Sequence, residues 1–138
     1  MSERNETHEP TEADLRDLLA GHIEKMLWPT LLLLLEGKAA HGYELIHALH
    51  EMDTIEGDLD PATVYRNLRR MDEDGLVSSY WENGPAGPAR RLYTLSERGE
   101  QALHLCAPLV SNRKDRLERF LQRYSAVRAD NGKEKPTK

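Results

Sequence analysis

Two groups of arginines stand out in a chain of 138 residues whose formal net charge at pH 7 is −5. The first group consists of Arg66, Arg69 and Arg70, which lie in the same segment as Thr63 and Asn67. The second group is the adjacent pair Arg90 and Arg91. A guanidinium group can donate two hydrogen bonds to guanine or to a phosphate, and an asparagine carboxamide pairs similarly with adenine. The grouping predicts a surface that contacts double-stranded DNA, and an ordinary solvated helix face is the alternative interpretation.

The negative net charge does not by itself exclude a nucleic-acid partner. Residues 1–20 carry six acids and two bases, residues 21–110 fourteen acids and eight bases, and residues 111–138 four acids and nine bases. Attraction to phosphate is local, because salt screens exposed charges beyond about 10 Å. The clustering of the arginines, and not the sum of the charges, is therefore the basis for expecting DNA.

Other classes of chemistry lack the residues that they need. His47 and His50 lie three apart, but no third ligand is placed to complete a metal site, so neither a metal nor another cofactor is expected. The sequence has no glycine-rich phosphate loop and no nucleophile beside a base, which argues against an enzyme. With a single cysteine, Cys106, and no leader or ~20-residue apolar run, the chain is expected in the cytoplasm without a membrane partner.

The first arginine group falls on a predicted helix with well-marked ends. Asp60 suits the N-cap, Pro61 the first helical position, and Gly75 the positive-φ position after the last turn. Apolar residues recur on the inner face at Val64, Leu68 and Met71. The opposite face is predicted to carry the possible DNA contacts Thr63, Tyr65, Arg66, Asn67, Arg69 and Arg70. Tyr65 is expected to divide its side chain between packing and a phosphate contact.

The second group lies at the second strand of a predicted β-hairpin. Residues 76–81 and 91–95 favour β-structure, and glycines and prolines separate them. Because side chains alternate across a strand, one of Arg90 and Arg91 is expected to contact DNA and the other to brace the hairpin. An arginine placed in the minor groove would gain from the negative potential there.

Three further helices are predicted ahead of these elements. A capping pattern at Thr11 begins a short helix, and an apolar helix that must be enclosed begins near Pro29. The third begins at His41 and Tyr43, which are candidate phosphate contacts because N–H groups at a helix N-terminus attract anions. The alternative for Tyr43 is a core aromatic residue.

The last predicted helix runs from Ser96 to Tyr124 and would be roughly 43 Å long. Its apolar seam consists of Leu103, Cys106, Val110, Leu117, Phe120, Leu121 and Tyr124. Such a seam needs a partner, and a second copy of the chain is the economical one. Three leucines of the N-terminal helix are expected to join this dimer interface: Leu15, Leu18 and Leu19. Pro108 predicts a kink, because proline removes a helical hydrogen bond.

Together the elements predict a mainly α fold with a small β-hairpin, namely a winged helix-turn-helix with N- and C-terminal dimerisation helices. The expected parts are a disordered tail at 1–10, an N-terminal helix at 11–28, a winged-helix DNA-binding domain at 29–95, a dimerisation helix at 96–128 and a disordered tail at 129–138.

The sequence resembles the PadR family of bacterial transcriptional regulators over residues 29–103. The motifs that match are His41-Gly42-Tyr43-Glu44-Leu45, Thr63-Val64-Tyr65, Glu73-Asp74-Gly75-Leu76-Val77 and Gly87-Pro88-Ala89-Arg90-Arg91-Leu92-Tyr93-Thr94-Leu95, followed by Gly99. The leucine run after Pro29, Trp81 and the wing look most like a short-tailed subgroup named for polyhydroxybutyrate-responsive repressors. Arg66 departs from the pattern, since the family usually has proline there, and residues 62–68 are also similar to the recognition helix of ferric-uptake-type metal sensors.

The resemblance implies a homodimer whose repression is relieved by a small molecule. Trp28, Phe120 and Tyr124 are candidate contacts for such an effector, and packing within the dimer interface is their alternative role. We therefore expect a ligand-responsive repressor that binds a palindromic operator. A winged helix that binds only other proteins is the competing class, and a metal-responsive regulator is less favoured.

Overall fold

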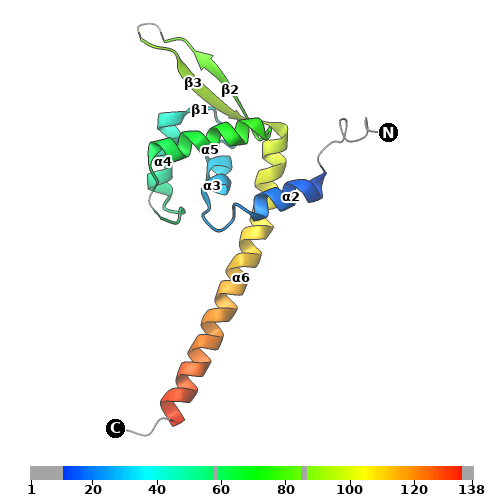
Figure 1. The fold of residues 1–138 in the computed structure, drawn as a ribbon, viewed down its shortest axis with the longest axis vertical. Coiled ribbons are helices and arrows are strands. Elements are labelled where there is room, and N and C mark those ends of the chain that lie inside the picture. Colours follow the sequence, from blue (N-terminus) through cyan, green and yellow to red (C-terminus); the bar gives the residue numbers. More distant parts are fainter. Residues whose placement is uncertain (1–10, 58, 85–86, 135–138) are drawn as a thin grey trace. The chain divides into compact units, whose positions relative to one another are not determined.

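The computed structural model describes residues 11–57, 59–84 and 87–134 (Figure 1). The elements in chain order are α2 (Glu12–Ala20), α3 (Leu27–Leu34), β1 (Ala40–His41), α4 (Gly42–Met52), α5 (Pro61–Glu73), β2 (Val77–Glu82), β3 (Arg90–Leu95) and α6 (Glu97–Glu134). The chain forms two compact units that divide after Cys106. The first unit has the predicted architecture, a winged helix-turn-helix that is mainly α with a small antiparallel sheet.

Helix α2 begins as predicted but is shorter. The Thr11 side chain accepts from the Asp14 backbone N–H at 3.1 Å, and the Asp14 carboxylate accepts from the Thr11 N–H at 3.0 Å. The helix ends at Ala20, and Met26 then takes a left-handed conformation with φ 68°, which a continuous helix does not permit. The expected helix over 11–28 is thus a helix, a turn and the start of α3.

Two of the three leucines assigned to a dimer interface belong instead to the core of their own protomer. Leu15 is 2% exposed and Leu19 is fully buried within the first unit, whereas Leu18 is half-buried. They join α3, whose residues from Leu27 to Leu32 are all buried, as expected for a helix that is apolar nearly all round. The stripe on α2 is therefore already covered within one copy.

The helix-turn-helix consists of α4 and α5. Helix α5 has the predicted ends, since the Asp60 side chain accepts from the Thr63 N–H at 2.7 Å and Gly75 has φ 80°. Its inner face is fully buried at Val64, Leu68 and Met71. The first residue of α4 is Gly42, and the Tyr65 ring of α5 fills the space where a β-carbon would stand. The absence of that carbon leaves room for the Tyr65 ring against the beginning of α4.

The sheet contains one strand more than the predicted hairpin. Its order is β1-β3-β2, all antiparallel, with Trp81 opposite Arg91 and Glu82 opposite Arg90. Strand β1 is two residues long and pairs His41 with Leu92. Periodicity cannot reveal so short a strand, because alternation needs about four residues to be recognised.

Ser96 joins the end of α5 to the beginning of α6. Its hydroxyl donates to the Gly75 carbonyl at 2.6 Å and accepts from the Gly99 N–H at 2.9 Å, and the second bond caps the first turn of α6. Cys106 is 3% exposed within the first unit, so it is a core residue there rather than part of a dimer seam, and burial raises the pKa of its thiol to about 11.

Helix α6 continues to Glu134 with Pro108 inside it, so it is longer than the expected dimerisation helix and takes in most of the segment expected as a tail at 129–138. The predicted tail at 1–10 and residues 135–138 lie outside the described part of the chain. None of the described helices is both long enough and apolar enough to span a bilayer.

Candidate nucleic-acid interface

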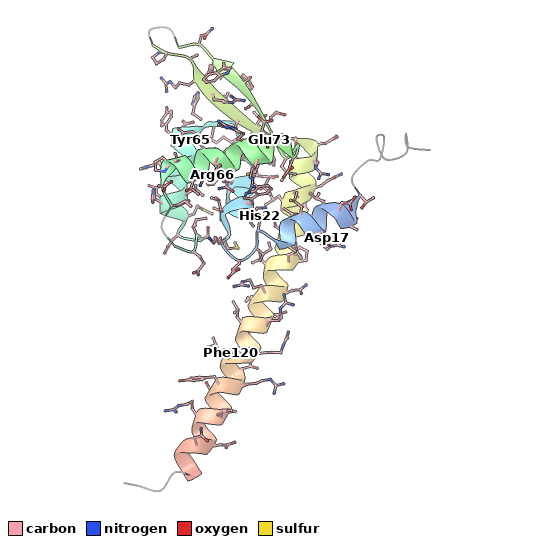
Figure 2. The ribbon with its side chains drawn as sticks, in the orientation of Figure 1. Asp17, His22, Tyr65, Arg66, Glu73 and Phe120 are labelled. Atoms are coloured by element: carbon pink, nitrogen blue, oxygen red, sulfur yellow. The ribbon has the colours of Figure 1, made fainter. Side chains whose placement is uncertain are left out.

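The outer face of α5 presents three arginines to solvent. Arg66, Arg69 and Arg70 are all exposed, and no described carboxylate lies within 4.0 Å of any of them. Among the described residues, Arg66 donates a hydrogen bond only to the hydroxyl of Thr63, at 3.3 Å. Tyr65 is 43% exposed and projects from the same helix (Figure 2). Helix α5 therefore offers cationic donors that the described residues do not satisfy with carboxylates.

Asn67 does not belong to this exposed set. Its carboxamide oxygen accepts from Trp28 Nε1 at 2.9 Å, and its amide nitrogen donates to the Thr63 carbonyl at 2.8 Å. The residue directly precedes the buried Leu68 and stands at the edge of the inner stripe. The predicted base contact is corrected to a structural bond between α5 and α3.

Trp28 likewise departs from its predicted role. The side chain is 1% exposed, and its ring stacks on His22 with centroids 3.7 Å apart and planes 9° apart. Burial is the main cause that lowers the pKa of His22, and the positive charge of Arg70 lowers it further. A buried indole with both its face and its N–H occupied is a core residue, not an open effector contact.

The two arginines of the hairpin have different partners. Arg91 Nε donates to Ser79 Oγ at 2.9 Å, and the Ser79 hydroxyl donates to Asp72 of α5 at 2.6 Å. The Arg91 guanidinium also lies 5.3 Å from the centre of the Trp81 ring. Arg91 also lies 3.8 Å from Asp72. These contacts tie the hairpin to α5, which is the bracing role.

Arg90 is turned toward the N-terminal end of α4. Its Nη1 donates to the hydroxyl of Tyr43 at 2.8 Å, and its guanidinium carbon is 5.6 Å from the centre of that ring. Both side chains are exposed, and within the described residues no carboxylate lies within 4.0 Å of Arg90. Tyr43, at 52% exposure, is a surface residue and not the core aromatic of the alternative interpretation.

His41 has carboxylates where a phosphate was expected. Its Nε2 lies 2.7 Å from Glu82 of β2, and its Nδ1 lies 3.2 Å from Glu44 of α4. Only 17% of its side chain is exposed. The Glu44 carboxylate also accepts the His41 backbone N–H at 2.7 Å, and this bond is the largest cause that lowers the pKa of Glu44. The prediction of a direct phosphate contact at His41 is corrected accordingly.

A groove of about 790 Å³ lies between the N-terminus of α4, α5 and the hairpin. It brings together predicted residues and residues that the sequence did not single out: His41, Gly42, Tyr43, Tyr65, Arg69, Asp72, Glu73, Trp81, Ala89, Arg90, Arg91 and Tyr93. Strand register places Ser79 and Trp81 on the face of Arg91, and the Ser79 hydroxyl in turn reaches Asp72 of α5. Register was not available from composition and periodicity alone.

The second unit carries an apolar stripe on α6 that is exposed in the single chain. Its residues are 52–65% exposed, namely Leu117, Phe120, Leu121, Tyr124 and Val127. Phe120, labelled in Figure 2, stacks with Tyr124 at a centroid distance of 6.4 Å. Val127 extends the predicted seam by one position, whereas Leu103 and Val110 are half-buried.

Metal-binding residues do not converge within the part of the chain that the structure describes. No group of three or more histidine, cysteine, aspartate or glutamate side chains there could hold a metal ion.

Known structures share the fold. A PadR-family regulator from Clostridium difficile R20291 is 27% identical, with a TM-score of 0.61 over 70% of this chain and 98% of its own. A PadR-family regulator from Eggerthella lenta is 23% identical, with a TM-score of 0.58 over 76% and 93%. Bacillus subtilis PadR in complex with operator DNA is 21% identical, with a TM-score of 0.52 over 58% and 45%. No curated protein matches the chain.

The family assignment rests on the sequence model of the transcriptional regulator PadR-like family, which matches residues 31–105, more than half of the chain. These residues span α3 to the beginning of α6 and therefore include the helix-turn-helix, the hairpin and the groove between them. This chain belongs to the PadR-like family of transcriptional regulators.

Proposed function

We propose that the protein is a sequence-specific DNA-binding transcriptional repressor that acts as a homodimer on a palindromic operator. The observation that carries the proposal is the outer face of α5, where Arg66, Arg69 and Arg70 are exposed and lack carboxylate partners among the described residues. The operator complex of Bacillus subtilis PadR supports the same use of this fold.

The residues divide into two roles on the duplex. Thr63, Arg66 and Arg70 contact base edges in the major groove, where one good bidentate pair contributes about 1–3 kcal/mol of discrimination. Tyr43, Tyr65, Arg69 and Arg90 line or border the groove beside the hairpin and contact phosphates, which fix position without reading sequence. Arg91 positions the hairpin through Ser79 and Asp72.

The acidic composition of the chain affects how strongly it should bind DNA in general. The net charge of −5 opposes approach to DNA, while the local arginine cluster attracts it, and both effects weaken with salt. Asp72 does not counteract the cluster in full, because Arg91 lies 3.8 Å from it. We therefore expect affinity to depend on the specific site more than on general charge.

The direct test is fluorescence-anisotropy titration of DNA from the region upstream of the gene, at two salt concentrations and with unrelated competitor DNA. Replacing Arg66 and Arg70 together by alanine should weaken specific binding at least about tenfold, the loss of one or more bidentate pairs. Arg16→Ala is the matched control, because Arg16 is an exposed arginine of α2 paired with Glu12 at 3.2 Å. Absence of binding at low salt would instead favour the protein-interaction alternative.

The homodimer and the response to a small molecule complete the proposal. Two copies are needed because successive major-groove half-sites lie about 34 Å apart. The exposed stripe on α6 supports a second copy as partner. An effector would bind beside Phe120 and Tyr124 at the dimer seam and act by favouring one spacing of the two α5 helices. Effector screening against the operator complex tests this part separately.

A further inference from the structure

The hairpin carries a large apolar side chain that the fold leaves open to solvent. Trp81 of β2 is 62% exposed and lines the groove between α4, α5 and the hairpin. Its indole N–H makes no hydrogen bond within the described residues, and the cation over its ring is Arg91. Such a contact contributes little to stability at an exposed site. A tryptophan exposed to this degree is typical of a surface that meets a partner, because its ring offers a large apolar area.

The position of Trp81 is set from α5 through three side chains. Asp72 of α5 accepts from the Ser79 hydroxyl at 2.6 Å, and that hydroxyl accepts from Arg91 Nε at 2.9 Å. The Arg91 guanidinium then lies 5.3 Å from the centre of the Trp81 ring. Trp81 and Arg91 are directly opposite each other in β2 and β3, and Ser79 shares their face because side chains alternate along a strand. The indole is therefore held at a defined place beside the helix that carries the exposed arginines.

The groove beside Trp81 combines cations with aromatic rings. Arg69 and Arg90 line it, both are exposed, and no described carboxylate lies within 4.0 Å of either. Arg69 also belongs to the exposed arginines of α5, so a duplex on that helix places its nearer strand over the groove. The backbone of DNA alternates a charged phosphate with a sugar that has an apolar face. Cations beside an exposed ring match this alternation, since proteins contact both parts of the backbone.

We propose that Trp81 is a further DNA contact, whose indole packs against deoxyribose of the strand over the groove while Arg69 and Arg90 hold its phosphates. This inference rests on the proposed function and adds to it a contact that does not depend on charge. Glu73 also lines the groove and repels phosphate, so cations alone do not account for holding a strand there. Arg91 acts as a positioning residue, because it holds the ring and is itself held by Ser79.

Tryptophan fluorescence can observe this contact directly. The chain has two tryptophans, and Trp28 is only 1% exposed, so quenching by acrylamide in solution reports mainly on Trp81. Adding a duplex from the region upstream of the gene should protect the wild-type protein from acrylamide, because the strand covers the indole. In Trp81→Phe the emission comes from Trp28 alone, and the same duplex should leave its quenching unchanged.

Titration of the same duplex at several salt concentrations measures what the contact contributes. Trp81→Ala should weaken binding about fivefold or more, the size expected from losing one aromatic contact. The slope of log affinity against log salt should stay as in the wild type, because no charge is removed, whereas Arg69→Ala should reduce it. Trp81→Phe should keep most of the affinity. Tyr80→Ala is the matched control and should bind like the wild type, since Tyr80 is 52% exposed on the next position and does not line the groove.

The outcomes separate the role of Trp81 from the proposed function. If the duplex binds but does not protect the wild type from acrylamide, or if Trp81→Ala binds as tightly as the wild type, the contact at Trp81 is overturned and the proposed function stands. A reduced salt slope in Trp81→Ala would also overturn it, because the loss would then come from a displaced arginine. Absence of binding by the wild type at low salt would overturn the proposed function, and the contact at Trp81 with it.

Discussion

At the scale of single residues, two glycines fix how closely backbone segments approach. A β-carbon on Gly42 would overlap the ring of Tyr65, and one on Gly99 would overlap the carbonyl oxygen of Leu76 and the side chain of Leu95. A tyrosine ring can turn aside, whereas a backbone carbonyl that follows α5 cannot move without disturbing the sheet. Gly99 therefore has the stricter requirement, although both glycines belong to the motifs shared with the PadR family.

Replacing Gly99 by alanine is expected to lower the free energy of unfolding by about 2–3 kcal/mol, the cost of forcing an extra carbon into a packed site. Urea denaturation followed by circular dichroism measures it. Gly21→Ala is the control, because its β-carbon would lie at an ordinary 3.5 Å from the Leu18 carbonyl and its φ is −73°. A stable Gly99→Ala protein would mean that α6 packs less closely against Leu76 than the structure shows.

At the scale of the elements, helix α5 has an outer face with exposed arginines and an inner edge that is hydrogen-bonded to α3. Asn67 connects the two helices by accepting from Trp28 of α3, and its amide group donates to the Thr63 carbonyl within α5. On the other side, Asp72 connects α5 to the hairpin through Ser79. Helix α5 is thus held along two edges, which keeps its exposed arginines in a defined orientation.

Asn67→Ala is expected to reduce stability by about 1–3 kcal/mol, because it leaves the buried Trp28 N–H without its acceptor. Thermal and urea unfolding measure the loss. Arg69→Ala on the exposed face should change stability by no more than about 0.5 kcal/mol. If Asn67→Ala were fully stable yet failed to bind the operator, the original assignment of Asn67 to base recognition would be restored.

His22, in the turn between α2 and α3, should make the free energy of unfolding depend on pH. Burial and then Arg70 lower the pKa of His22 below its ordinary value of 6.5. As pH falls through 6.5, the unfolded chain binds a proton that the folded chain resists, so the free energy of unfolding decreases until the folded-state pKa is passed. Stability is therefore greater above this window than within it.

His22→Phe keeps an aromatic ring against Trp28 but cannot titrate, so its stability should fall less than that of the wild type between pH 7.5 and pH 5. Urea unfolding at a series of pH values measures the difference. The exposed His50, changed to Asn, is the control and should preserve the wild-type profile. Parallel profiles for His22→Phe and the wild type would contradict the assignment.

At the scale of the whole molecule, none of residues 107–132 in the second unit is buried within the chain. Its long helix exposes an apolar stripe from Leu117 to Val127, and a single helix in water cannot bury such a stripe. The stripe therefore supports association of two chains, and dimerisation would also give two α5 helices for two half-sites. Leu15 and Leu19 of α2, by contrast, are already buried within a single chain.

Phe120→Glu should shift the protein from dimer toward monomer, because a charge replaces an apolar side chain at the centre of the stripe. Sedimentation velocity over a range of concentrations measures the change. Gln122→Glu adds the same charge two residues along, at an exposed position outside the stripe, and should leave the dimer intact. A dimer that withstands Phe120→Glu would place the interface elsewhere.

The sequence by itself determined most helix ends, the hairpin, the arginine groups and the family. These depend on caps, periodicity and turn residues that act over a few positions, as at Asp60, Gly75 and Ser96. Tertiary structure decided which side chains meet across the chain. Trp28 reaches Asn67 over 39 positions and His41 reaches Glu82 over 41, and no local rule relates such pairs. Asn67 and His41 were predicted to contact DNA, and only the packed structure shows that they form internal bonds instead. The partner of a buried or half-buried polar group depends on all the elements that surround it.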